Sequence, residues 1–123
     1  MLFTYVIEQL SQRGIAYVHV IEPRAGGGAT SNDESQPRTA PAFRKAFHGA
    51  FISAGGYTAE TADQAIAHGD ADAVAFGRLF LANPDLPERF RSGAELNTPN
   101  RHTFYGGSEV GYTDYPSLQE ATR

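Results

Sequence analysis

The 123-residue sequence contains no cysteine, no tryptophan and a single lysine, Lys45. Without cysteine the chain can form neither disulfides nor iron–sulfur clusters nor thiolate zinc sites, and a reducing compartment, the cytoplasm, is expected. The formal net charge is −4, and the clustered lysine and arginine that bind nucleic acid or an anionic membrane are missing. We therefore expect neither of these as a partner.

Long apolar runs are missing as well. The first seven residues are largely apolar, but no basic segment flanks them and Glu8 follows directly. Neither a signal peptide nor a membrane span is expected from this pattern. With 41% hydrophobic and 20% charged residues, the composition is that of one soluble globular domain.

The first third of the chain predicts a helix, a strand and a loop. Apolar residues at helical spacing predict a helix over residues 2–13, which Gly14 ends. Residues 15–21 (IAYVHVI) predict a strand buried on both faces, with His19 as a satisfied core residue. The Gly-, Ser- and Pro-rich residues 25–41 predict a surface loop, because their three successive glycines lack a GxGxxG or Walker pattern.

The same plan then repeats. Helical periodicity returns over residues 42–47, and residues 50–54 (AFISA) predict a second buried strand. A tight turn follows at residues 55–57 (GGY). Thr58 is then the predicted N-cap of a third helix, which Gly69 ends.

A third buried strand is predicted over residues 73–76, and it stops abruptly at Gly77 and Arg78. Glycine lets an anion approach the backbone closely, and arginine offers a fork of hydrogen-bond donors. The end of this strand is therefore where we expect a bound phosphate.

The remainder of the chain is predicted to be less regular. An irregular segment containing Asn83 and Pro84 comes first, and Asp85 is the predicted cap of a last short helix. Pro87 would lie in its first turn and Phe90 on its inner face. From Ser92 onward glycine, proline, tyrosine and polar residues predict loop with little regular structure.

Alternating helices and strands indicate right-handed βαβ crossovers and a parallel sheet. Two α/β folds agree with this order, a small doubly wound sheet and a piece of a (β/α)8 barrel. Three strands are few for either fold, because parallel sheets are covered on both faces and an eight-stranded barrel takes about 250 residues. Unpaired strand edges would favour self-association or pairing with a second chain.

Four blocks resemble a known family in their order and spacing: residues 15–24 (IAYVHVIEPR), 51–65 (FISAGGYTAETADQA), 72–87 (DAVAFGRLFLANPDLP) and 103–116 (TFYGGSEVGYTDYP). They resemble the C-terminal third of the Old Yellow Enzyme family, the FMN-dependent ene-reductases of the N-ethylmaleimide reductase and 12-oxophytodienoate reductase type. The resemblance covers nearly the whole chain.

The resemblance implies strands six to eight, with their helices, of a TIM (β/α)8 barrel that is incomplete as a single chain. Residues 1–123 would form part of an FMN-binding barrel domain, with βα units over 1–91 and an irregular tail over 92–123. The chain would begin inside the helix before strand six, which explains why no capping residue precedes Leu2.

The resemblance also assigns cofactor-binding residues. In such barrels the phosphate commonly lies on the loops after strands seven and eight. By this likeness the FMN phosphate would be held after the two strands, and an aromatic residue of the TFY motif would lie near the flavin and the substrate cavity. The residues are Ala54, Gly55, Gly56, Gly77, Arg78 and, in the TFY motif, Tyr105.

In function, the resemblance implies reduction of FMN by NADPH or NADH, followed by hydride transfer to an activated alkene such as an enone, a maleimide or a nitroalkene. The family residues that hold the substrate and contact the flavin ring belong to the first five strands. We therefore expect no catalytic residue in this chain. No metal site is expected either, because the histidines lack metal-ligand spacing.

Alternatives remain at this point. The chain could be one subunit of a split enzyme, a truncated enzyme or a remnant, or a non-catalytic α/β module that binds a phosphorylated ligand or a protein. Gly55 and Gly56 also suit a plain strand-to-helix turn, and Arg78 suits a surface ion pair. Tyr105 has the ordinary alternative of packing or facing solvent.

Overall fold

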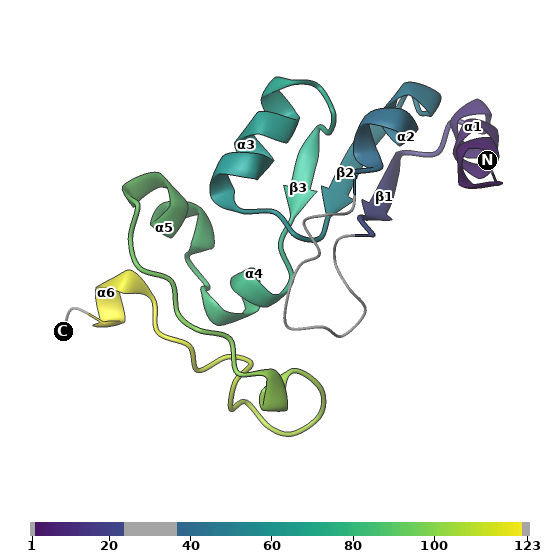
Figure 1. The fold of residues 1–123 in the computed structure, drawn as a ribbon. Helices are drawn as coiled ribbons and strands as arrows, with labels where there is room; N and C mark the ends of the chain where they lie inside the picture. The colour runs from purple at the N-terminus through teal and green to yellow at the C-terminus, as the bar shows by residue number, and fades with distance from the viewer. Residues whose placement is uncertain (1, 24–36, 122–123) are drawn as a thin grey trace. The chain divides into compact units, whose positions relative to one another are not determined.

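The computed structural model describes residues 2–23 and 37–121, and the statements below refer to them (Figure 1). The chain divides into two compact units, one ending at Ala75 and one beginning at Phe76, which are described separately. The elements are α1 (Leu2–Gln12), β1 (Tyr17–Ile21), α2 (Ala40–Ala46), β2 (Ala50–Ala54), α3 (Ala59–Ala67), β3 (Ala73–Ala75), α4 (Arg78–Ala82), α5 (Leu86–Ser92), the 3-10 helix η1 (Arg101–Thr103) and α6 (Leu118–Ala121).

The first unit contains a three-stranded parallel sheet in the order β1-β2-β3 (Figure 1). Ala54, at the end of β2, pairs with Ile21 on one side and Ala75 on the other. The predicted α/β class and parallel sheet are confirmed. β2 occupies the predicted residues, while β1 begins two residues later than predicted and β3 ends one residue earlier.

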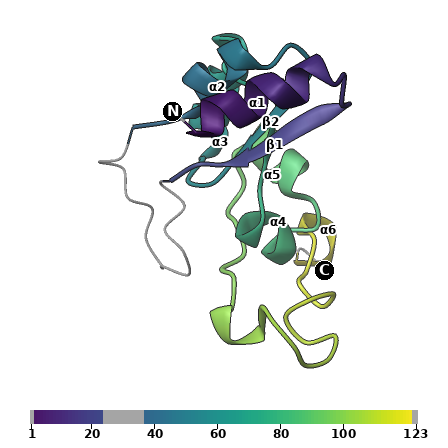
Figure 2. The ribbon, with the colours of Figure 1, turned by 90° about the vertical axis from the view of Figure 1, so that its right-hand side faces the viewer.

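One face of the sheet carries the core. Successive side chains of a strand point to opposite faces, and Val18 and Phe51, which are paired in the sheet, both point to the covered face. α1 and α2 lie on one side of β1 (Figure 2). The apolar cluster of this core consists of Ile7, Val18, Ala40, Phe47, Phe51 and Ala71.

The opposite face of the sheet is open. Burial alternates along β1, with Tyr17 57% and Ile21 71% exposed. His19 lies on the same exposed face. The prediction of a strand buried on both faces, with His19 in the core, is therefore wrong for the part of the chain that is described. The physical reason is that the described helices of the first unit cover one of the two faces that a parallel sheet normally buries.

Helix ends follow the local sequence. Thr58 and Thr61 form the reciprocal hydrogen bonds of a capping box at the start of α3, which confirms the predicted cap. Gly14 and Gly69, the predicted stops of α1 and α3, have φ angles of 65° and 75°, which glycine adopts without a side-chain clash. The glycine run at residues 26–28 lies outside the described residues, and α2 begins at Ala40, inside the predicted loop.

The second unit begins with a helix where an irregular segment was predicted. α4 has the sequence RLFLA, and leucine, arginine and alanine are strong helix formers. The helix ends before Asn83 because the residue preceding a proline avoids helical backbone angles. Phe76 contacts Phe90 of α5 edge to face, with 5.2 Å between ring centroids, so Phe90 packs inward as predicted.

α5 contains Pro87 in its first turn and Asp85 at its N-cap position, both as predicted, but the Asp85 side chain makes no capping hydrogen bond. The Asp85 side chain is instead engaged by Arg89 and by the backbone N–H of Leu118, each at 2.7 Å. In the described part of the tail, only η1 and α6 are regular, in line with the predicted loop character. No helix among the described residues is long and apolar enough to cross a membrane.

Candidate functional site

The glycine turn, Gly55 and Gly56, follows directly on β2. Their φ angles are 97° and 67°, in a region that residues with a side chain rarely adopt. Ala54, the preceding residue, ends β2 beside the last residue of β3. At the carboxyl edge of the sheet, the turn therefore presents two successive residues of backbone that carry no side chain.

A tyrosine and an arginine support this turn. The Nη2 of Arg38 donates a hydrogen bond to the carbonyl oxygen of Gly56 at 3.3 Å. The Arg38 guanidinium also lies 3.8 Å from the centroid of the Tyr57 ring, a cation–π arrangement. Tyr57 is buried, and its hydroxyl lies 2.8 Å from the Oγ of Ser53.

Glu22 is a buried carboxylate at the end of β1, with 1% of the residue exposed. It accepts hydrogen bonds from the backbone N–H groups of Thr39 at 2.7 Å and Ala40 at 3.0 Å. The hydroxyls of Thr39 and Ser53 lie 3.0 Å and 3.4 Å from its carboxylate oxygens. Glu22 thereby satisfies backbone donors at the start of α2, where a negative charge is favourable.

Neither Glu22 nor Arg38 was among the predicted site residues. The one available signal was the carboxylate of Glu22 directly after an apolar strand and before Pro23. Arg38 lies within the Gly-, Ser- and Pro-rich residues 25–41, where its residue type fits no periodic pattern. Their hydrogen bonds span 17 to 31 residues of sequence, beyond the range of local patterns.

Gly77 and Arg78, the second predicted pair, belong to the second unit. Gly77 immediately precedes α4, and a Cβ added there would meet no atom within 4 Å. Arg78 is the first residue of α4 and is exposed. Ala75, which precedes them by two residues, ends β3 at the carboxyl edge of the sheet.

Tyr105, the last of the predicted site residues, is 93% exposed. Its ring contacts Phe104 edge to face, with 6.4 Å between centroids. The structure thus brings Ala54 and the glycine turn together and places Gly77 beside Arg78. Tyr105 lies separately in the tail.

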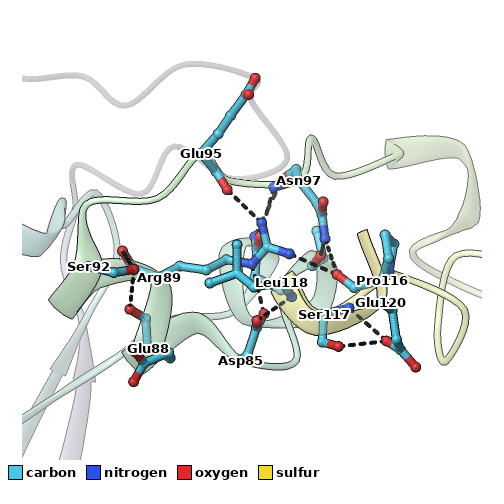
Figure 3. Close-up of polar contacts among 12 residues, drawn as sticks. Asp85, Glu88, Arg89, Ser92, Glu95, Asn97, Pro116, Ser117, Leu118 and Glu120 are labelled. Atoms are coloured by element: carbon cyan, nitrogen blue, oxygen red, sulfur yellow. Dashed lines mark hydrogen bonds and ion pairs between the residues drawn. The ribbon is translucent and has the colours of Figure 1, made fainter. Parts of the chain in front are cut away.

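The second unit is held by a buried arginine (Figure 3). Arg89 is 3% exposed, and its Nε donates to Asp85 at 2.7 Å. Its Nη1 and Nη2 donate to the carbonyl oxygens of Glu95 at 2.5 Å and Pro116 at 2.8 Å. Arg89, followed by the Leu118 N–H, lowers the pKa of Asp85 below its usual 3.8.

An asparagine pair completes this network. The backbone N–H of Asn97 donates to Asn83 Oδ1 at 2.7 Å, and Asn83 Nδ2 donates to the carbonyl of Leu79 at 2.8 Å. Asn97 Nδ2 donates to the carbonyls of Ala82 and Pro116, each at 2.8 Å. Side chains of the NPDLP segment therefore anchor the irregular tail.

Residues 2–97 match the profile of the NADH:flavin oxidoreductase / NADH oxidase family. The chain belongs to this family. Among curated proteins, it is 51% identical over 119 residues to 12-oxophytodienoate reductase 2 of Arabidopsis thaliana, covering 94% of this chain and 30% of that protein. It is 53% identical over 121 residues to putative 12-oxophytodienoate reductase 10 of Oryza sativa subsp. japonica, covering 94% and 38%.

Solved structures agree. Morphinone reductase in complex with tetrahydroNAD matches with a TM-score of 0.79 and 46% identity, over 98% of this chain and 31% of that one. The old yellow enzyme homologue from Zymomonas mobilis matches with a TM-score of 0.82 and 40% identity, over 94% and 32%. The resemblance to Old Yellow Enzymes is confirmed, and the chain spans about a third of the length of these relatives.

The cofactors of this family are FMN and NAD(P)H, and the residues present fit the phosphate end of FMN. The glycine turn is two successive half-buried residues at positive φ that carry no side chain, and the position of a Cβ at Gly77 is open space. Arg78, which follows Gly77, and Arg38 carry positive charge. The Nη1 of Arg38 is a buried nitrogen without a hydrogen-bond partner in the described structure. Donors of this chemistry suit a phosphate monoester.

Proposed function

We propose that this chain is the FMN-phosphate-binding part of a flavin-dependent ene-reductase of the Old Yellow Enzyme family. The observation that carries the proposal is the glycine turn at positive φ on the carboxyl edge of the parallel sheet. The same edge of β3 leads into Gly77 and Arg78. In barrels of this class, phosphate commonly lies at the carboxyl ends of the last two strands.

In this proposal each residue anchors rather than reacts. The backbone N–H groups around Ala54, Gly55, Gly56 and Gly77 donate to phosphate oxygens, and Arg78 adds a bidentate, charge-assisted contact. Tyr105 lies beside the flavin and the substrate cavity. No proton transfer is assigned to any of these residues.

When bound, FMN supplies hydride transfer from NADPH or NADH to an activated alkene such as an enone, a maleimide or a nitroalkene. The chain's contribution is to fix the position of the cofactor, since a small displacement of a reacting group costs much of the rate. Burying the phosphate against fixed donors gives that position at the end farthest from the reacting ring.

The open face of the sheet supports the finer fold proposal. Tyr17, His19 and Ile21 lie on that face and are exposed, whereas a parallel sheet normally buries both faces. We propose that the three strands are strands six to eight of a (β/α)8 barrel. The remaining strands, or a second copy of the chain, then cover the open face and the unpaired edges.

Comparing FMN with riboflavin, which has the same ring but no phosphate, tests the phosphate assignment. Quenching of flavin fluorescence by the 123-residue chain gives both dissociation constants. We expect tighter binding of FMN, and Arg78→Ala should weaken FMN binding by roughly 10- to 100-fold while leaving riboflavin unchanged, because a hydrogen bond to a charged group is worth about 1.5–3 kcal/mol.

Arg91→Ala is the matched control, since Arg91 is an exposed arginine of α5 paired only with the exposed Glu88 in the described structure. It should leave both dissociation constants unchanged. Equal weakening of FMN and riboflavin by Arg78→Ala, or no weakening at all, would show that Arg78 does not bind the phosphate.

A second candidate is a non-catalytic α/β module that binds a phosphorylated ligand. In its favour, the contacts proposed above for the glycine turn, Gly77 and Arg78 are all phosphate contacts, and no catalytic role is assigned to a residue of this chain. NADPH oxidation with N-ethylmaleimide separates the two functions. A chain that binds FMN but gives no turnover, even with a fragment carrying the remaining barrel strands, would be a binding module.

A further inference from the structure

The glycine turn is held by a closed circuit of side-chain contacts. Glu22 binds the backbone of Thr39, and the neighbouring Arg38 binds the carbonyl of Gly56. Tyr57, the next residue, contacts Ser53, whose hydroxyl returns to Glu22. Residues after β1, before α2 and after β2 are thereby joined at the turn.

The Arg38 contact fixes one particular peptide. The Gly56–Tyr57 peptide is trans, because no described peptide bond is cis, and in a trans peptide the N–H and the C=O point in opposite directions. With the Gly56 carbonyl directed to Arg38, the Tyr57 N–H is directed away from Arg38. Glycine alone would allow this peptide to rotate, so the orientation depends on the contact with Arg38.

The same contact brings a positive charge to the turn. Among the described residues, the three ion pairs involve Arg44, Arg89 and Arg91, and Arg38 forms none. Within the described ranges, its guanidinium contacts the Tyr57 ring and the Gly56 carbonyl, and its Nη1 is a buried nitrogen with no hydrogen-bond partner there. Arg38 is half-buried, and a partly desolvated guanidinium favours a neighbouring anion, which a phosphate at the turn would supply.

We propose that Arg38 and Tyr57, together the arginine clamp, are positioning residues that hold the glycine turn in its anion-binding conformation and supply part of the charge that attracts a phosphate monoester. The inference rests on the proposed function. Arg38 acts through the Gly56 peptide and through its charge, while Tyr57 holds the guanidinium in place.

The first test is the ratio of the riboflavin and FMN dissociation constants of the 123-residue chain. A purely structural role would weaken both flavins alike. Arg38→Met should lower the preference for FMN about tenfold and leave riboflavin unchanged. Tyr57→Leu retains the charge of Arg38 but removes the ring, so the preference for FMN should fall by less than in Arg38→Met. Arg38→Lys should retain part of the preference, because the positive charge remains while the planar fork of donors is lost.

Arg44→Met is the matched control. Arg44 is also half-buried, and it lies at the opposite edge of the sheet, where it pairs with Asp72 at 3.7 Å. The carboxylate of Asp72 accepts from the N–H of Phe51 near the start of β2. This variant should retain the wild-type preference for FMN.

A second readout needs no flavin. Inorganic phosphate, titrated into the 15N-labelled chain, should shift the amide resonances of Gly55, Gly56 and Tyr57. The shifts should shrink in Arg38→Met and persist in Arg44→Met. Circular dichroism checks that each variant is folded. If Arg38→Met does not fold, the test uses Arg38→Lys, with the same ratio of dissociation constants and the same phosphate titration.

The outcomes separate this inference from the proposed function. Loss of FMN preference in Arg78→Ala but not in the Arg38 variants would overturn the clamp and leave the proposed function standing. A wild-type chain that binds riboflavin as tightly as FMN and does not respond to phosphate would overturn both. Loss of preference in the variants of both arginines supports both.

Discussion

Each of the two units is organised by one buried charged side chain, and the two charges are opposite. Glu22, 1% exposed, accepts hydrogen bonds from backbone N–H groups in the first unit. Arg89, 3% exposed, donates to backbone carbonyls in the second. Glu22 thereby fixes the start of α2 and Arg89 fixes the irregular tail, in a chain that has no cysteine and hence no disulfide.

The two buried side chains differ in whether their partners carry an opposite charge. Arg89 is paired with the carboxylate of Asp85, whereas the described partners of Glu22 are backbone N–H groups and hydroxyls. Removing Glu22 therefore leaves several buried donors without an acceptor. Through its contact with Ser53, which contacts Tyr57, Glu22 is also connected to the glycine turn. Glu22 therefore supports the proposed site, whereas Arg89 stabilises the tail.

The largest effect is expected for Glu22→Ala. Loss of the carboxylate leaves the N–H groups of Thr39 and Ala40 unsatisfied, and the free energy of unfolding should fall by about 3 kcal/mol. Glu22→Gln keeps the shape and one acceptor oxygen and should lose less. Urea unfolding followed by circular dichroism measures both.

Glu60→Ala is the control for this measurement, because Glu60 is exposed on α3. It should change the stability by no more than about 0.5 kcal/mol. If Glu22→Ala were equally mild, the carboxylate would not organise the first unit and the comparison between the units would fail.

A smaller effect is expected for Arg89→Met. Methionine retains the apolar stem, and Asp85 is partly exposed, so water can solvate its carboxylate when the guanidinium is removed. The loss should be about 2 kcal/mol, with faster amide exchange in the tail residues that Arg89 anchors. Hydrogen exchange followed by NMR locates the change.

Arg91 offers the sharpest control, since it lies on the same helix two positions away. Its pair with Glu88 is exposed on both sides, and exposed ion pairs contribute at most about 1 kcal/mol. Arg91→Met should leave tail exchange unchanged. Equal effects of the two substitutions would show that helix α5, rather than the buried guanidinium, determines the order of the tail.

Local patterns were sufficient for much of the fold. β2 was predicted to the residue, and the cap at Thr58 and the glycine stops follow from rules that act within four residues. α4 was missed although its composition favours a helix, because Asn83 and Pro84 suggested an irregular segment. The exposed face of β1 was missed because burial depends on what covers a strand rather than on its own residues.

The buried charges could not be predicted from such patterns. Arg89 reaches the carbonyl of Pro116 across 27 residues of sequence, and Asp85 reaches Leu118 across 33. A local rule correctly placed Asp85 at the N-cap of α5, but its side chain binds Arg89 and the Leu118 N–H instead of capping the helix. For the candidate site, the glycine turn follows from the sequence pattern, while its phosphate and the roles of Arg78 and Tyr105 follow from family resemblance and stay predictions.

The smallest expected effect is a difference in acid sensitivity between the units. Arg89 and the Leu118 N–H hold the pKa of Asp85 below its usual 3.8, and Ser117, through its backbone N–H and hydroxyl, lowers that of Glu120. A depressed pKa in the folded state means that the stabilisation is complete above the unfolded pKa and is lost as the pH falls through the folded one. Below about pH 4, exchange should therefore rise first in the tail, and Asp85→Asn should flatten this dependence, while Asp63→Asn on α3 should not. If Asp85→Asn left the acid sensitivity of the tail unchanged, that sensitivity would belong to Glu120. Arg89 would then stabilise the tail through its hydrogen bonds to backbone carbonyls and not through its salt bridge with Asp85.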